Sequence, residues 1–172
     1  MKHFIVYLRY QLCALLEYIT ADSIDKSAFK RCALIVNAFV DEECEKLAID
    51  KPYIVIHRID RDATGFCRGG YLICIDPLKG DDYLRTLRHE LRHVWQWRYR
   101  KGIMDWTIQN LDHNVYDEYF YNPTEIDARH YAKFHEDCGI MDVPVEMLNK
   151  LKENGGFVNQ MKAVFEHLYH GV

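Results

Sequence analysis

The sequence predicts an α+β protein in which helices flank a small sheet. Three observations support this: helical spacing of apolar residues covers residues 1–48, strand-forming residues with turn signals occupy residues 52–75, and helical spacing returns from residue 82. Strands that follow one another, with helices grouped before and after them, are typical of α+β proteins. We therefore expect a sheet of about three strands, packed on helices from both flanks.

Length and composition fit one globular domain. The chain has 172 residues, a net charge of −4 and 28% charged residues, so a general nucleic-acid binder is disfavoured. We expect a single domain over residues 1–172, with a helical N-terminal scaffold (1–50), a core (51–138) and a C-terminal helical segment (139–172). Its six cysteines are scattered without a C-x-x-C pair, which favours a reducing compartment.

The first apolar stretch, Phe4–Ile19, needs a separate interpretation. Arg9, Gln11 and Glu17 interrupt it, and no small-residue cleavage site follows. No uninterrupted apolar run approaches the ~20 residues of a membrane span. The sequence therefore predicts a cytoplasmic protein with no membrane partner.

Two helices are expected before the strands, over Met1–Thr20 and Ser27–Ala48, separated by a break at Asp22–Asp25. Both are interpreted as core scaffold. The side chains expected to face the core are Phe4, Tyr7, Leu8, Leu12, Leu15 and Leu16 in the first helix, and Phe29, Cys32, Ala33, Val36, Phe39, Val40 and Leu47 in the second.

Three strands are expected, over Tyr53–His57, Thr64–Arg68 and Tyr71–Ile75, with Gly69-Gly70 as the hairpin loop between the last two. We expect the last strand to be an edge strand. Its free backbone groups would then pair with an extended peptide at Tyr71, Ile73 and Cys74. The alternative is an edge covered by a loop.

The strongest motif is His89-Glu90-Leu91-Arg92-His93, which reads H-E-x-x-H within a predicted helix over Asp82–Lys101. Residues four apart lie one above the other on a helix, so the two imidazoles can converge on one Zn²⁺. Glu90 is then close enough to act on a water molecule without binding the metal. The alternative is two surface histidines on an amphipathic helix whose apolar stripe is Leu84, Leu87, Leu91 and Trp95.

A catalytic zinc site needs a third protein ligand. The best candidate is Glu125, in a segment from Asn122 that opens a helix running to about His135. Its position also fits a capping box, with Asn122 as the N-cap and Pro123 in the first turn, and that role needs no metal. Asp127 is the second candidate and His113 the third.

The two segments His89–His93 (H-E-L-R-H) and Asn122–Ala128 (N-P-T-E-I-D-A) together resemble the glutamate-type zincins, or gluzincins, and most of all the minigluzincins and the ImmA/IrrE-like peptidases. The resemblance covers Tyr71 to about Phe134. It implies a zincin-like fold in which a small sheet, an active-site helix and a glutamate helix enclose zinc. It also implies His89, His93 and Glu125 as zinc ligands and Glu90 as the general base of peptide hydrolysis. Many gluzincins carry an acid four residues after the ligand glutamate, where this chain has Arg129.

Other functional expectations remain open. Tyr121, His130 and Tyr131 are candidates for stabilising the oxyanion. A stripe of arginines lies on the motif helix at Arg85, Arg88 and Arg92. It either receives an acidic substrate or a nucleic-acid phosphate, or is a solvated face.

The segment Ile103–Tyr121 is expected to be an irregular binding loop or a cover for the core, and two helices are expected over Val145–Asn154 and Val158–His170. In some minigluzincins a terminal segment occupies the cleft, so the resemblance also admits a C-terminal segment that inhibits the site. The alternatives to a metallopeptidase are a non-catalytic zincin-fold binding or regulatory module, and a helical interaction module whose motif is accidental.

Overall fold

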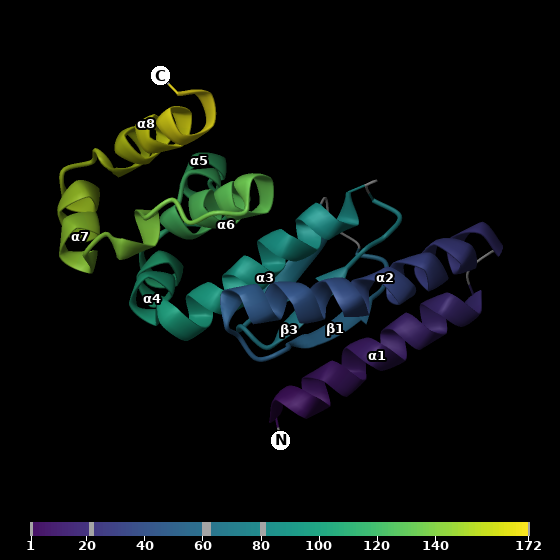
Figure 1. Cartoon of the computed structure of the whole chain (residues 1–172). Coiled ribbons are helices and arrows are strands. Elements are labelled where there is room, and N and C mark those ends of the chain that lie inside the picture. Colours follow the sequence, from purple (N-terminus) through teal and green to yellow (C-terminus); the bar gives the residue numbers. More distant parts are fainter. Residues whose placement is uncertain (1, 21–22, 60–62, 80–81, 172) are drawn as a thin grey trace. The chain divides into compact units, whose positions relative to one another are not determined.

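The computed structural model describes residues 2–20, 23–59, 63–79 and 82–171. Over these residues the chain is α+β and mostly helical, with eight α-helices, one short 3-10 helix and one mixed sheet of three strands (Figure 1). By its contacts the chain forms two compact units, Met1–Trp95 and Gln96–Val172. The division falls inside one helix, α3, and the single domain expected from the sequence stays a prediction.

The first unit contains α1 (Lys2–Thr20), α2 (Ser23–Leu47), the sheet and most of α3 (Tyr83–Tyr99). The elements agree with the sequence prediction to within a few residues, and Met1 and Asp22 lie outside the described residues. In α2 the buried residues confirm most of the predicted inward side: Phe29, Cys32, Val36, Val40 and Leu47. Phe39 is half-buried, and the prediction for Ala33 is wrong because it is exposed.

The sheet consists of β1 (Tyr53–Ile56), β2 (Gly65–Arg68) and β3 (Leu72–Ile75), in the order β1-β3-β2. β1 is parallel to β3 and β2 is antiparallel to it. Gly69 and Gly70 form the β2–β3 turn, as predicted, with φ of 58° and 73°. The expectation that the third strand is an edge strand is wrong, because β3 is central and all four of its side chains are buried. Its unbroken apolar run is typical of a strand covered on both faces.

The inward side of α1 also differs from the prediction. Tyr7 stacks on Tyr53 with ring centroids 4.4 Å apart, and the Gln11 side-chain amide donates to the Ile54 carbonyl at 3.3 Å. Of the six side chains expected to face the core, only Tyr7 does so. The other five are about half exposed: Phe4, Leu8, Leu12, Leu15 and Leu16. The helix therefore contacts the sheet through tyrosines and carries a second apolar side.

The second unit contains α4 (Lys101–Asn110), α5 (Tyr116–Phe120), α6 (Pro123–Phe134), the 3-10 helix η1 (Ile140–Asp142), α7 (Val145–Glu153) and α8 (Phe157–His170). The prediction of an irregular segment over Ile103–Tyr121 is wrong, since most of it is helical. Trp106 of α4 is buried, and its indole N–H donates to the Asn149 side-chain carbonyl at 2.6 Å. The two predicted C-terminal helices are confirmed as α7 and α8.

Over the described residues, no helix combines the length and the apolar character needed to cross a membrane.

Candidate metal centre

Helix α3 carries the H-E-x-x-H motif, and its sequence explains where the helix begins and how it packs. The Asp82 carboxylate accepts from the Arg85 amide at 2.9 Å, which caps the N-terminus. Leu87 and Leu91 are completely buried. This packing orients the helix, so that His89 is only half-buried while the intervening Glu90 is 6% exposed.

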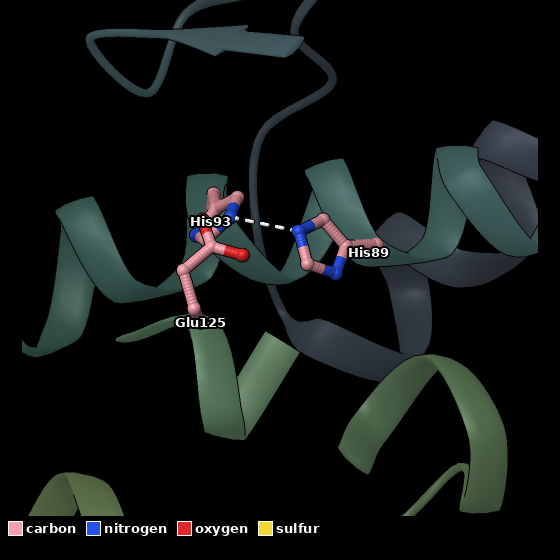
Figure 2. Close-up of side chains that lie close together, drawn as sticks. All are labelled: His89, His93 and Glu125. Atoms are coloured by element: carbon pink, nitrogen blue, oxygen red, sulfur yellow. Dashed lines mark hydrogen bonds between the residues drawn. The ribbon is translucent and has the colours of Figure 1, made fainter. Parts of the chain in front are cut away.

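The three residues predicted as zinc ligands lie together (Figure 2). His89, His93 and Glu125 each offer one ligand atom, and these atoms all lie within 4.8 Å of one another. The Nε2 atoms of His89 and His93 are 3.1 Å apart. Two nitrogens bound to one tetrahedral Zn²⁺ would be about 3.3 Å apart, given Zn–N bonds of about 2.05 Å. The spacing of the imidazoles and the chemistry of the set, two imidazoles and a carboxylate, therefore fit zinc.

Glu90 lies beside the first residue of β2. A Cβ atom placed on Gly65 would be 3.5 Å from Glu90 Cγ and only 2.7 Å from Thr86 Cγ2. The Thr64 and Thr86 hydroxyl oxygens are 3.1 Å apart and form a hydrogen bond. Strand and helix therefore approach so closely here that only glycine fits at position 65.

Burial disfavours the thiolate form of two cysteines of the sheet, Cys67 and Cys74. Burial is the main cause that raises the pKa of the Cys74 thiol to about 12. Burial, and secondarily the negative charge of Glu90, raises the pKa of the Cys67 thiol still further. Neither cysteine belongs to the group of possible metal ligands formed by His89, His93 and Glu125.

The N-terminus of α6 presents Glu125. Asn122 is the N-cap and its side-chain carbonyl accepts from the Glu125 amide at 2.9 Å, with Pro123 in the first turn. This part of the predicted cap is confirmed. Because Asn122 caps through the Glu125 backbone, the cap and a ligand role for the Glu125 side chain are compatible.

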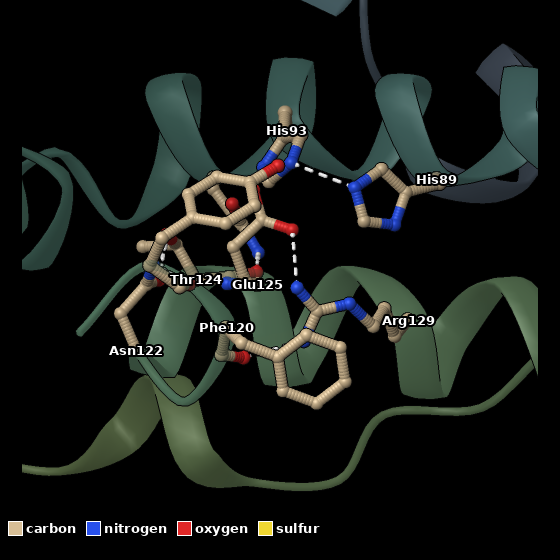
Figure 3. Close-up of polar contacts among 9 residues, drawn as sticks. His89, His93, Phe120, Asn122, Thr124, Glu125 and Arg129 are labelled. Atoms are coloured by element: carbon tan, nitrogen blue, oxygen red, sulfur yellow. Dashed lines mark hydrogen bonds and ion pairs between the residues drawn. The ribbon is translucent and has the colours of Figure 1, made fainter. Parts of the chain in front are cut away.

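Arg129 holds the Glu125 carboxylate from one turn further along α6 (Figure 3). Its Nη2 donates to Glu125 Oε2 at 3.1 Å, and its Nη1 donates to the Phe120 carbonyl. The guanidinium also lies over the Phe120 ring, 3.8 Å from the centroid. The position where many gluzincins carry an acid is thus occupied by a cation that orients the glutamate directly.

A buried polar cluster fixes the start of α6 to the last turn of α3. The Gln96 amide nitrogen donates to the Thr124 carbonyl at 2.9 Å and to the Asp127 carboxylate at 2.7 Å. Gln96 and Asp127 have no exposed surface. Asp127, the second candidate for the third ligand, therefore has a structural role. The roles of Gln96 and Arg129 were missed from the sequence, although a glutamine one turn after His93 was the available signal.

Among the remaining candidates, His113 and His130 are not part of this group of possible metal ligands. His130 contacts the rings of Phe134 and Tyr169, with centroids 4.7 Å and 6.2 Å away, and Tyr121 packs against Phe165. The other candidates lie as follows: Tyr131 is buried in α6, His113 is exposed beside Tyr119, Tyr71 stacks on His3, and Ile73 and Cys74 lie buried in the central strand. Pairing of a peptide with β3 is therefore excluded by the strand order.

The arginine stripe is not a solvated face as a whole. Arg92 is 3% exposed, with its guanidinium 3.7 Å from the Trp95 ring centroid. Arg88 lies 3.4 Å from the buried Glu43 carboxylate. Both arginines therefore support the packing of α3, and only Arg85 is exposed.

Comparison of the chain with protein-family models, with curated proteins and with solved structures found no match.

Proposed function

We propose that this chain is a zinc-dependent metallopeptidase with a zincin-like fold. The observation that carries the proposal is the group of His89, His93 and Glu125, whose ligand atoms lie within 4.8 Å of one another. Two histidines and a glutamate form one of the ligand sets of catalytic zinc sites, in which a fourth position stays open for water or substrate.

Zinc bound at this group would lower the pKa of a water molecule and polarise the carbonyl of a peptide. The chain's own contribution to the chemistry is Glu90, which follows the first histidine and is 6% exposed. Its carboxylate accepts the proton of the attacking water and then delivers it to the leaving amine. Arg129 donates to Glu125 Oε2 at 3.1 Å and so orients the carboxylate that would hold zinc.

The peptide substrate is proposed to pair with β2, the edge strand beside Glu90. The Thr64 carbonyl accepts from the Asp76 amide at 2.9 Å, so the backbone groups of Thr64 and of every second residue after it pair with β3. The backbone N–H and C=O groups of Gly65 and Cys67 then point to the other side, where no strand of the described sheet lies. An extended peptide added there would run past Glu90, since Gly65 is the residue that contacts it.

Metal analysis is the first experiment. The purified chain should contain about one zinc per molecule, and His93→Ala and Glu125→Ala should each lose it. His113→Ala is the matched control, because His113 is exposed and lies outside the group. The proposal is wrong if the wild-type chain binds no zinc, or if it retains zinc after both ligand substitutions.

Cleavage of a peptide library separates catalysis from metal binding. Glu90→Gln should keep zinc and lose at least about 10³-fold in kcat/KM, because a neutral amide cannot take the proton. Retained zinc with unchanged cleavage would contradict the assignment of Glu90.

A second candidate function is a non-catalytic binding or regulatory module. The ion pair between Arg129 and Glu125 favours it, because a carboxylate that already has a cationic partner does not need a metal. The 3.1 Å contact between His89 and His93 is also compatible with a hydrogen bond between neutral imidazoles. Two results together would favour this module over the peptidase: the purified protein contains no zinc, and Glu90→Gln leaves its biological activity unchanged.

A further inference from the structure

We infer that the outward side of α1 is a self-association surface that pairs with the same surface of a second copy of this chain. The inference is independent of the proposed peptidase activity, because α1 contributes nothing to the zinc group. It starts from the exposed side chains of this helix, defined here as the α1 seam: Phe4, Ile5, Leu8, Leu12, Leu15 and Leu16, whose exposed fractions are 49–59%.

The opposite side of α1 already has its partner. Val6, Tyr7, Tyr10 and Ala14 pack against the core cluster of the sheet, and α1 runs beside β1 (Figure 1). At 100° per residue, the six seam residues fall within an arc of about 120° on the far side of the helix. No polar residue between Phe4 and Leu16 falls in that arc. The helix therefore has two separate apolar sides, and only one of them is covered within the described chain.

The spacing of the seam favours another helix as its partner. Ile5, Leu8, Leu12 and Leu15 follow one another at intervals of three, four and three residues. This is the a and d spacing of a coiled coil, in which each apolar side chain enters a hole formed by four residues of the facing helix. Because the pattern is complementary to itself, a two-fold pair of α1 helices would use the same residues on both copies.

The area available matches the requirement of a stable dimer. Six side chains that are about half exposed offer roughly 100 Å² each, or about 600 Å² per copy and 1,200 Å² for the pair. That total is at the lower end of stable protein interfaces. A single exposed apolar patch of about 600 Å² is also at the upper limit seen for monomers.

The charges disfavour a membrane surface as the partner. Helices that lie on a membrane combine an apolar side with a polar side rich in lysine and arginine. Here the side opposite the seam is packed against the sheet, and Arg9 is the only basic residue between Phe4 and Leu16. Two seams brought together, by contrast, would bury no charged group.

Sedimentation velocity of the full chain at about 1 to 100 µM tests the inference. We expect a monomer–dimer equilibrium in the micromolar range. The double substitution Leu8→Lys/Leu12→Lys should raise the dissociation constant at least about 100-fold, because it places two lysines in each seam. Leu34→Lys is the matched control: Leu34 lies on α2, is 81% exposed and lies outside the seam, so dimerisation should be unchanged.

Leu12→Ala covers the case in which the double variant fails to fold. It keeps the helix propensity and should weaken the dimer about tenfold. The inference is overturned if the wild-type chain is monomeric at 100 µM, or if the dimer resists both seam variants. It is also overturned if the monomeric chain cosediments with vesicles of phosphatidylcholine and phosphatidylserine, since the seam would then serve a membrane.

Discussion

Replacement of Gln96 by leucine tests whether the buried polar cluster stabilises the second unit. Gln96 donates to the Asp127 carboxylate at 2.7 Å and to the Thr124 carbonyl at 2.9 Å. Both acceptors are at most 4% exposed. Leucine fills a similar volume but donates no hydrogen bond, so Gln96→Leu removes one donor from a buried carboxylate and one from a buried carbonyl.

The expected loss follows from these two contacts. A hydrogen bond to a charged group contributes about 1.5–3 kcal/mol and one to a carbonyl about 1 kcal/mol, so Gln96→Leu should lower the free energy of unfolding by about 2.5–4 kcal/mol. This is a large part of the stability of about 5–15 kcal/mol that is typical of single domains. If the chain binds zinc as proposed, the zinc affinity should fall as well, because the same cluster fixes the turn of α6 that carries Glu125.

Urea denaturation at pH 7, followed by circular dichroism, measures the loss. Gln109→Leu is the control, since Gln109 is exposed on α4 and its replacement should change stability by no more than about 0.5 kcal/mol. In a double-mutant cycle with Asp127→Asn, the combined loss should be at least 1 kcal/mol smaller than the sum of the single losses. A loss below about 1 kcal/mol for Gln96→Leu, or strict additivity, would refute the reasoning.

Two further predictions concern packing and pH. Gly65→Ala should lower the free energy of unfolding by about 1–3 kcal/mol, because the new Cβ would lie 2.7 Å from the Thr86 methyl group of α3. Gly102→Ala is the control: a Cβ there would meet no atom within 4 Å, so this substitution should raise the melting temperature slightly. A hydrogen bond from the Asp112 amide, and secondarily Lys152, lowers the pKa of Glu118. Its stabilisation is therefore present above the unfolded-state pKa and is lost as pH falls through the folded-state pKa. Glu118→Gln should cost less than about 1 kcal/mol at pH 7 and nothing at pH 2 in urea titrations, and an equal cost at both values would contradict this.

Local signals in the sequence predicted much of the fold. The period of apolar residues located most of the helices, the glycine pair located the β2–β3 turn, and Asn122-Pro123 located the start of α6. Each of these signals acts within a few residues of chain. The H-E-x-x-H spacing likewise places two imidazoles together on any regular helix, and Glu125 was chosen from a short candidate set.

The wrong predictions depend on contacts distant in the chain. Whether β3 is central or at the edge depends on β1. These two strands pair directly in the sheet, although β2 lies between them in the sequence. The side of α1 that meets the sheet is decided by the fit of Tyr7 and Gln11 to β1, whereas both sides of the helix are apolar in sequence. The contact between Arg129 and Glu125 was missed, because an arginine side chain four residues away on a helix has several possible orientations.

The burial of the cysteines has a practical consequence for labelling. Of the six cysteines, all within the described residues, only Cys13 is exposed, and burial raises the pKa of Cys32 and of Cys44 to about 11. A maleimide probe added briefly at neutral pH should therefore attach first to Cys13, which lies on α1 next to Leu12. A fluorophore or spin probe at this natural position would report how far apart two chains hold their first helices, without any engineered residue.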